Sequence, residues 1–151
     1  ITGQVAMQKN LEKLGSITFT DDEVEYANTI LRETGKEEKG IDGSVQKLRE
    51  TKPAQGGSTD VGDVSQIVPV IRMRATISAK DGPWHSWAVV ACSGMSIGHK
   101  GMVYAAKALG MTMADLYTDK KLVEEVKKDF KVNKTNPVYQ PRILPGPPKL
   151  N

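Results

Sequence analysis

The sequence predicts an α/β protein in which helices pack against part of a β-sheet. Apolar side chains recur at helical spacing in four stretches of the 151-residue chain, over about 3–14, 21–34 and 98–116 and from 119 onward. The segment Ile71–Ile77 instead alternates apolar and polar side chains with a period of two, which is typical of a half-buried strand. A single strand cannot satisfy its own edges, so we expect neighbouring strands to lie in chain outside this sequence.

The first two expected helices have recognisable ends. The helix over 3–14 stops at Gly15, because glycine readily leaves the helical conformation. The second begins with a capping box, in which the Thr20 hydroxyl accepts from the backbone N–H of Glu23 and the Glu23 carboxylate reaches back to Thr20. Its apolar stripe ends before Gly35.

The middle of the chain is mostly irregular. Residues 35–44 are rich in glycine, lysine and glutamate and predict a mobile surface loop, followed by a short helix over 45–49. The turn-rich connection over 53–57 then leads to the strand expected at 71–77, with Pro69 tolerated near its start.

The longest helix is expected over 98–116, and the last part of the chain is expected to be extended. One face of this helix carries Met102, Ala105 or Ala106, Leu109, Met113 and Leu116. A further helix follows from about residue 119, with apolar side chains again in register. From Asn136 the chain contains five prolines, which exclude a helix there.

Composition excludes several classes of function. The 21 Lys and Arg residues are interleaved with 18 Asp and Glu residues, so the chain lacks the concentrated basic stripe of a nucleic-acid-binding protein. No apolar stretch approaches the roughly 20 residues of a membrane span. The chain has one cysteine, Cys92, so it cannot form an internal disulfide. Because Cys92 lies in an apolar run, we expect its thiol to be buried and inert. The lack of a disulfide and of a visible signal peptide predicts a reducing, cytoplasmic compartment.

Both histidines and both tryptophans lie within sixteen residues, which makes this stretch the first place to look for chemistry. His85 follows Trp84 and precedes Ser86 and Trp87, and on composition it is as compatible with a metal ligand as with a core histidine. His99 fits the start of a helix as well as a site, and Asp60 fits a turn or helix cap. A metal site needs three or four ligands, and no HExxH or CxxC spacing is present.

Three motifs, in order and spacing, resemble one enzyme family. They are Gly57-Ser-Thr-Asp-Val-Gly-Asp-Val-Ser65, the Pro-Trp-His-Ser-Trp motif around His85, and Ser96-Ile-Gly-His-Lys-Gly-Met102 followed by Ala105-Ala-Lys107. The chain resembles the co-catalytic metallopeptidase and amidohydrolase family that includes carboxypeptidase G, aminoacylase and the bacterial hippurate hydrolases. The resemblance extends to the proline-rich end and spans nearly the whole chain.

The resemblance implies a fold and a chemistry. Members of this family have an α/β catalytic domain interrupted by a lid domain, bind two divalent metals (zinc or manganese), and cleave an amide next to a carboxylate-bearing group. Matching the motifs residue by residue implies that His85 is a metal ligand. It implies that Thr59 and Asp60 lie in the same cleft, where they would contact either the substrate or the side chains that bind the metal. His99 matches a motif found in a subgroup of this family, and the resemblance places it with Thr59 and Asp60, near the substrate or the metal ligands. The family's catalytic glutamate has no counterpart here, so no catalytic residue is expected in this chain.

The resemblance also implies how the chain is organised and what it needs. We expect the C-terminal portion of a two-metal amidohydrolase, with a helical segment over 1–52 that follows an absent lid, a sheet and helix core over 53–135, and an extended tail over 136–151. Its partners would be the N-terminal part of the catalytic domain, the lid and a small-molecule amide substrate such as an N-acyl glutamate. A homo-oligomer is compatible with the family. The alternative is a non-catalytic interaction module or split subunit that docks onto a partner.

Overall fold

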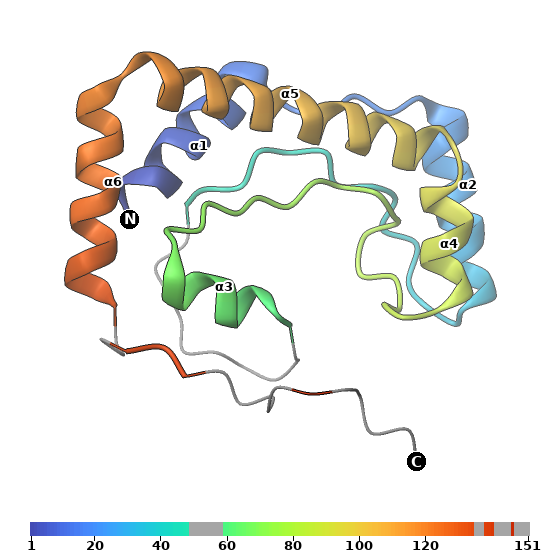
Figure 1. Cartoon of the computed structure of the whole chain (residues 1–151). Coiled ribbons are helices and arrows are strands. Elements are labelled where there is room, and N and C mark those ends of the chain that lie inside the picture. The colour runs from blue at the N-terminus through green and yellow to red at the C-terminus, as the bar shows by residue number, and fades with distance from the viewer. Residues whose placement is uncertain (49–58, 135–137, 141–145, 147–151) are drawn as a thin grey trace.

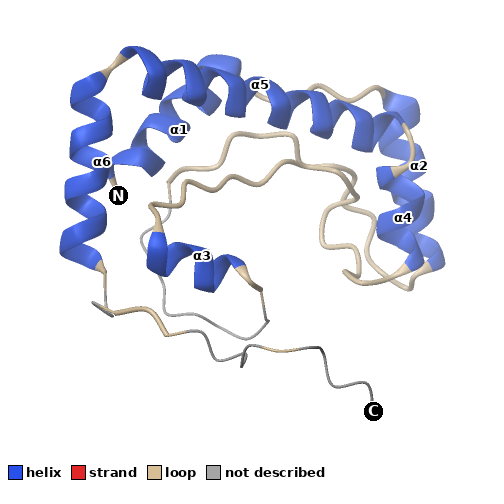
Figure 2. Ribbon diagram, in the orientation of Figure 1, coloured by secondary structure: helices blue, strands red, loops and turns tan. Residues whose placement is uncertain are grey.

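The structure is a computed structural model that describes residues 1–48, 59–134, 138–140 and 146. In these residues it contains helices and loops but no β-strand (Figure 2). The expected α/β class, with helices packed on a partial sheet, is therefore wrong for the described part of the chain. The helices are α1 (Thr2–Leu14), α2 (Asp21–Glu33), α3 (Val61–Ile67), α4 (Trp87–Ser93), α5 (Ser96–Thr118) and α6 (Lys120–Asn133).

The long helix α5 organises the described part of the chain. Figure 1 shows α1 running beneath α5, α6 descending from one of its ends, and α2 with α4 at the other end. Asn10 of α1 is buried against α5, where its amide donates to the Thr112 hydroxyl at 3.1 Å and to the Asp115 carboxylate at 2.7 Å. The Asp129 carboxylate of α6 accepts from both the backbone N–H and the hydroxyl of Thr2, which fastens α6 to the start of α1.

The main core lies where α2, α4 and α5 meet. Leu31, Cys92 and Ile97 are almost completely buried there, together with small alanine side chains from neighbouring segments. Burying side chains of this size removes apolar surface from water, which is the main favourable contribution to folding. Cys92 is a free, buried thiol, as its apolar surroundings in the sequence predicted.

Helix ends agree closely with their sequence signals. The backbone N–H of Gly15, at φ 72°, donates to the Leu11 carbonyl and ends α1. The capping box of α2 is confirmed, since the Thr20 hydroxyl accepts from Glu23 N and the Glu23 carboxylate accepts from Thr20 N. At the junction of the last two helices, the Asp119 carboxylate accepts from Leu122 N and caps α6.

The expected strand over Ile71–Ile77 is wrong. These residues form a stretched loop beneath α1 and α5 (Figure 1), and no backbone–backbone hydrogen bond joins them to any other described residue. A period of two shows which side chains can be buried, but a strand exists only where a second backbone completes its hydrogen-bond ladder. The short helix expected over 45–49 is also absent in residues 45–48, which form the second stretched loop; residue 49 is outside the described part.

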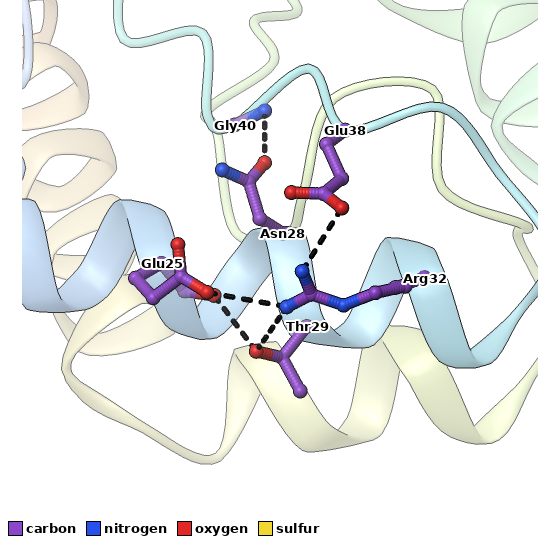
Figure 3. A network of polar contacts seen from close by, with 6 residues as sticks. All are labelled: Glu25, Asn28, Thr29, Arg32, Glu38 and Gly40. Atoms are coloured by element: carbon purple, nitrogen blue, oxygen red, sulfur yellow. Dashed lines mark hydrogen bonds and ion pairs between the residues drawn. The ribbon is translucent and has the colours of Figure 1, made fainter.

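The loop expected to be mobile over 35–44 is fastened at its middle. The buried Gly40, at φ 60°, donates its N–H to the Asn28 side-chain oxygen at 2.8 Å and accepts from Lys80 N at 2.8 Å. Figure 3 shows the contact with Asn28 beside an exposed network in which Arg32 bridges the Glu25 and Glu38 carboxylates. Exposed ion pairs contribute little, so the Gly40 contacts hold the loop.

Two short helices were not anticipated from the sequence. The helices α3 and α4 each span only 7 residues, too few for an apolar stripe to repeat. The apolar run that begins at Ala88 was recognised, but not its helical conformation. The expected divisions of the chain near residues 52 and 135 lie outside the described residues.

None of the described helices is long and apolar enough to cross a membrane.

The outward face of α5 is apolar. Met102 is 63% exposed, Leu109 45% and Met113 54%, at the helical spacing that the sequence indicated. The opposite face of α5, including Ala108 and Ile97, is buried against the rest of the chain. A helix that is apolar on both faces is typical of the interior of a larger core.

We expect this face to make the isolated chain self-associate, because a contiguous exposed apolar patch favours association. Leu109→Lys places a charge in the middle of the face and should keep the chain monomeric. Lys107→Gln, at an exposed polar position of the same helix, should leave the association unchanged. Sedimentation velocity at increasing concentration measures the effect, and a strictly monomeric unmodified chain would contradict the expectation.

Candidate functional site

His85 lies in a tight turn directly before α4. Its φ is 58°, in the left-handed region that non-glycine residues seldom adopt, and its side chain is exposed. Neither ring nitrogen makes a hydrogen bond within the described residues. The flanking Trp84 and Trp87 are 68% and 55% exposed, so they do not enclose His85 in a packed core. The imidazole is therefore available to a ligand.

The turn that carries His85 is held from both sides. The Ser86 hydroxyl donates to the Pro83 carbonyl at 2.6 Å and closes the turn around the histidine. On the upstream side, Asp81 (φ 59°) forms an ion pair with Lys39 at 3.1 Å. On the downstream side, the Tyr26 hydroxyl of α2 donates to the Ala91 carbonyl of α4 at 3.3 Å. These contacts on both sides hold His85 in its left-handed conformation in spite of the local backbone strain.

Thr59 and Asp60 lie at the start of α3. Both are exposed, and the Thr59 hydroxyl accepts from Val61 N at 3.3 Å. Asp60 occupies the N-cap position, but its carboxylate makes no capping hydrogen bond. One turn further, the Asp63 carboxylate accepts from the Tyr139 hydroxyl at 3.0 Å, and this contact raises the pKa of Tyr139. Figure 1 shows α3 lying apart from α4, and Asp60 and His85 do not belong to any group of three or more potential metal ligands in the described residues.

The motif Ser96–Met102 is explained largely by packing at the start of α5. Glu23 accepts from the Ser96 hydroxyl at 2.6 Å and from the Lys100 ammonium at 2.6 Å, in addition to its capping contact with Thr20. The Lys100 ammonium also donates to the Thr18 carbonyl and lies 5.5 Å from the centroid of the Phe19 ring. These contacts fasten α5 to the N-terminus of α2.

The two glycines of this motif allow close approach of the backbone. A Cβ atom on Gly98 would lie 2.0 Å from the Ser93 carbonyl oxygen, and one on Gly101 would lie 2.2 Å from the Thr76 carbonyl oxygen. Ile97, directly before Gly98, is 1% exposed. His99 is the exception, since its side chain is exposed and makes no hydrogen bond with the described residues. Its position on α5 does not place it with His85 or Asp60 in a common cluster.

Glu23 should make stability depend on pH. Hydrogen bonds from Lys100, Ser96 and Thr20 lower the pKa of Glu23 from 4.5 to about 2. The carboxylate therefore stabilises the fold fully above pH 4.5, and this contribution is lost as the pH falls toward about 2. Glu23→Gln should lower the thermal midpoint at pH 7 and flatten its decline in that acidic window. Glu33→Gln, an exposed position of the same helix, should leave the profile unchanged; identical profiles for both variants would contradict this role of Glu23.

The described residues do not form a metal site by themselves. No group of three His, Cys, Asp or Glu side chains in the ranges that the structure covers could hold a metal ion. His85 nevertheless fits one ligand position, because both its nitrogens lack partners among the described residues and its backbone conformation is fixed by the turn. Any further ligands would have to come from outside these residues.

Sequence motifs located His85 but missed the polar contacts that position the helices. Glu23 and Lys100 are separated by 77 residues, and Asn10 and Thr112 by 102. A capping box gives no sign that its glutamate also binds a distant lysine. Only covariation between such positions would have indicated these pairs.

Comparison with known proteins gives one similarity. No family profile matches the chain, and no solved structure matches it. Over 96 residues, however, the chain is 38% identical to a subunit of the p-aminobenzoyl-glutamate hydrolase of Escherichia coli (strain K12). The aligned region covers 61% of this chain and 20% of that protein, so the chain spans about a fifth of the length of the curated relative that it matches. The resemblance on which the motif assignment rests is thereby confirmed at the level of sequence: this chain is similar to part of a hydrolase subunit.

Proposed function

We propose that the chain is the C-terminal portion of the catalytic domain of a metal-dependent amidohydrolase. The reaction would be hydrolysis of an N-acyl amino-acid amide such as p-aminobenzoyl-glutamate. The observation that carries this proposal is the 38% identity to a subunit of p-aminobenzoyl-glutamate hydrolase. The exposed, conformationally fixed His85 supports it, because its imidazole is available to bind a metal.

His85 is proposed to hold a divalent metal, zinc or manganese, through one ring nitrogen. When bound, such a metal supplies Lewis-acid activation of water and of the amide carbonyl. We also propose that three further residues contact the substrate or orient the side chains that bind the metal: Thr59, Asp60 and His99. This requires them to approach His85 in the complete protein, because the described residues do not gather them. The general base, the remaining ligands and the lid would come from the rest of the enzyme.

The partners follow from the same proposal. The name of the relative describes a subunit, which supports a second subunit in addition to the missing parts of the catalytic domain. The buried, unpaired Cys92 is compatible with a reducing compartment, and we place the enzyme in the cytoplasm.

Activity measurements test the proposal directly. The 151-residue chain alone should not hydrolyse p-aminobenzoyl-glutamate, because a general base must lie within hydrogen-bond reach of the attacking water. The protein encoded by the complete reading frame, with its partner subunit, should release p-aminobenzoate and glutamate. A chelator should abolish this release, and zinc or manganese should restore it. Chelator-sensitive turnover by the isolated chain, or none by the complete protein, would contradict the proposal.

A second candidate, a non-catalytic module that docks onto a partner, is favoured by the exposed apolar face of α5. The sequence of the gene upstream of the Ile1 codon distinguishes the two. A lid domain and an earlier cluster of His, Asp and Glu residues would favour the hydrolase. A start codon close to Ile1 would favour the module or a split subunit.

A further inference from the structure

The stretched loop that replaces the expected strand is fastened in two places. The Gln4 side chain of α1 accepts from Arg72 N at 2.7 Å and donates to the Arg72 carbonyl at 3.0 Å. Four residues later, the Thr76 hydroxyl donates to the Asp42 carbonyl, and the Thr76 carbonyl faces Gly101 of α5. The backbone between these two positions is therefore held in place beneath α1 and α5 (Figure 1).

Two arginines extend from this fixed backbone on the same side. Arg72 and Arg74 are two residues apart in a stretched segment, and side chains at that spacing point to the same face. Both are exposed, whereas Met73 between them is half-buried. At a rise of about 3.3 Å per residue, the two Cα atoms lie about 7 Å apart. The pair therefore brings two guanidinium groups within reach of one small ligand.

Both arginines line a groove whose acidic residues are already paired. The Asp42 carboxylate forms an ion pair with Lys80 at 3.3 Å, and the Asp81 carboxylate forms one with Lys39 at 3.1 Å. In contrast, neither arginine forms an ion pair with the described residues. A guanidinium group matches the geometry of a carboxylate or phosphate, so the groove offers two matched positions for an anionic ligand.

The same groove reaches the turn that carries His85. Trp84, which directly precedes His85, lines the groove and is 68% exposed. Its indole offers a flat apolar surface that suits an aromatic acyl group, whereas the two arginines suit an acidic group. The lining therefore provides complements for both halves of an N-acyl acidic amino acid.

We propose that Arg72 and Arg74 determine substrate specificity by binding the two carboxylates of an N-acyl dicarboxylic amino acid. Each guanidinium group binds one carboxylate through two parallel hydrogen bonds. The acyl group contacts Trp84, so the amide bond lies between the arginines and the turn of His85. A substrate with only one carboxylate leaves one guanidinium group unpaired, which selects against it. This inference rests on the proposed function and adds the residues that recognise the acidic end of the substrate.

Kinetics of the complete enzyme with two substrates test the proposal. The substrates are p-aminobenzoyl-glutamate and p-aminobenzoyl-glutamine, which differ in the charge of one side-chain group. Arg72→Gln and Arg74→Gln should each raise KM for the glutamate substrate at least ~10-fold, because each removes hydrogen bonds between charged groups. The change in kcat should be less than ~2-fold, because these contacts are made equally before and during the reaction.

The glutamine substrate should respond to only one of the two changes. The arginine that binds the side-chain carboxylate has no anionic partner in this substrate, so its loss should change KM less than ~2-fold. The loss of the other arginine should still raise KM at least ~10-fold. This difference assigns each arginine to one carboxylate, and a general effect on folding would not produce it.

Matched variants separate recognition from charge. Arg74→Lys keeps the charge but loses the planar fork, so its KM should lie between those of the unmodified enzyme and Arg74→Gln. Lys107→Gln with Lys128→Gln removes two positive charges at exposed positions outside the groove and should change KM less than ~2-fold. All variants should keep the thermal midpoint, because the altered side chains are exposed. Glutarate should compete with the substrate more strongly than inorganic phosphate at the same concentration.

Three outcomes would overturn the proposal and leave the proposed function intact. Turnover with unchanged KM in both arginine variants would show that the arginines do not bind the substrate. A lower thermal midpoint with unchanged KM would show that they pair with acidic residues of the rest of the enzyme. Stronger competition by phosphate than by glutarate, lost in Arg72→Gln, would assign the pair to a phosphate-bearing ligand.

A complete protein that hydrolyses neither substrate would contradict the proposed function, and binding would then decide on the arginines. Equilibrium dialysis measures binding of p-aminobenzoyl-glutamate to the complete protein and to its Arg72→Gln with Arg74→Gln variant. Binding that is at least ~10-fold weaker in the variant would support the assignment of the arginines. Equal binding to both proteins, or binding to neither, would overturn it.

Discussion

Under the proposed function, His85→Ala should lower amide hydrolysis by the complete enzyme at least ~100-fold, because a direct metal ligand would matter at least as much as the outer partners whose loss costs about 10–100-fold. The fold should remain intact, since the His85 side chain is exposed and makes no hydrogen bond with the described residues. A thermal midpoint within about 2 °C of the unmodified protein would agree with this, as a surface change costs about 0.5 kcal/mol or less. Steady-state kinetics and thermal melting measure both quantities.

His99→Ala is the matched control, because His99 is the other histidine of the chain and is also exposed, without a side-chain hydrogen bond to the described residues. If His99 lies on the substrate side, its loss should raise KM and leave the metal content unchanged. His85→Ala should reduce the metal content itself. Equal metal content in both variants, with activity retained in His85→Ala, would show that His85 is not a metal ligand.

Gly101→Ala should destabilise the chain by about 3 kcal/mol, the upper part of the range for overpacking a close contact. The added Cβ would lie 2.2 Å from the Thr76 carbonyl oxygen and 2.8 Å from a methyl group of Ile77. The helix would therefore have to move away from the 71–78 segment. Gly98→Ala meets the Ser93 carbonyl at 2.0 Å and should have a similar effect. Urea unfolding, with the slope compared between variants, gives the free energy of unfolding.

Gly110→Ala is the control within the same helix. No atom lies within 4 Å of the Cβ that would be added there. Alanine has a higher helix propensity than glycine, so this variant should be more stable by about 0.5–1 kcal/mol. Equal destabilisation by Gly101→Ala and Gly110→Ala would contradict the close approach of α5 to the 71–78 segment.

Local sequence signals predicted the longer helices well because those signals act over a few residues. The capping box at Thr20 and the glycine after α1 stabilise helix ends through neighbouring backbone groups, and both are found where expected. The prediction of a strand over residues 71–77 was wrong because a strand depends on contacts distant in sequence. Its alternation fits a strand, but a strand requires a ladder of hydrogen bonds to a second backbone, and no backbone–backbone hydrogen bond joins residues 71–77 to any other described residue.

The candidate site could be predicted only in outline. The aromatic setting of His85 marked it in the sequence, yet no local rule gives its left-handed conformation or its exposed ring. The motif around Lys100 was recognised by resemblance alone. Contacts with Glu23 explain the serine and the lysine, and close approach to the Ser93 and Thr76 carbonyls explains the two glycines. Three of these four residues act through contacts distant in sequence.

Anomalous diffraction from the complete enzyme loaded with zinc tests the central claim, that His85 is a metal ligand, most directly. Data collected on both sides of the zinc absorption edge locate the metal independently of the fitted protein atoms. A ring nitrogen of His85 should lie about 2.0–2.1 Å from a zinc peak, the usual distance for zinc bound by histidine. Zinc bound entirely by other residues, with the His85 imidazole directed into solvent, would contradict the claim.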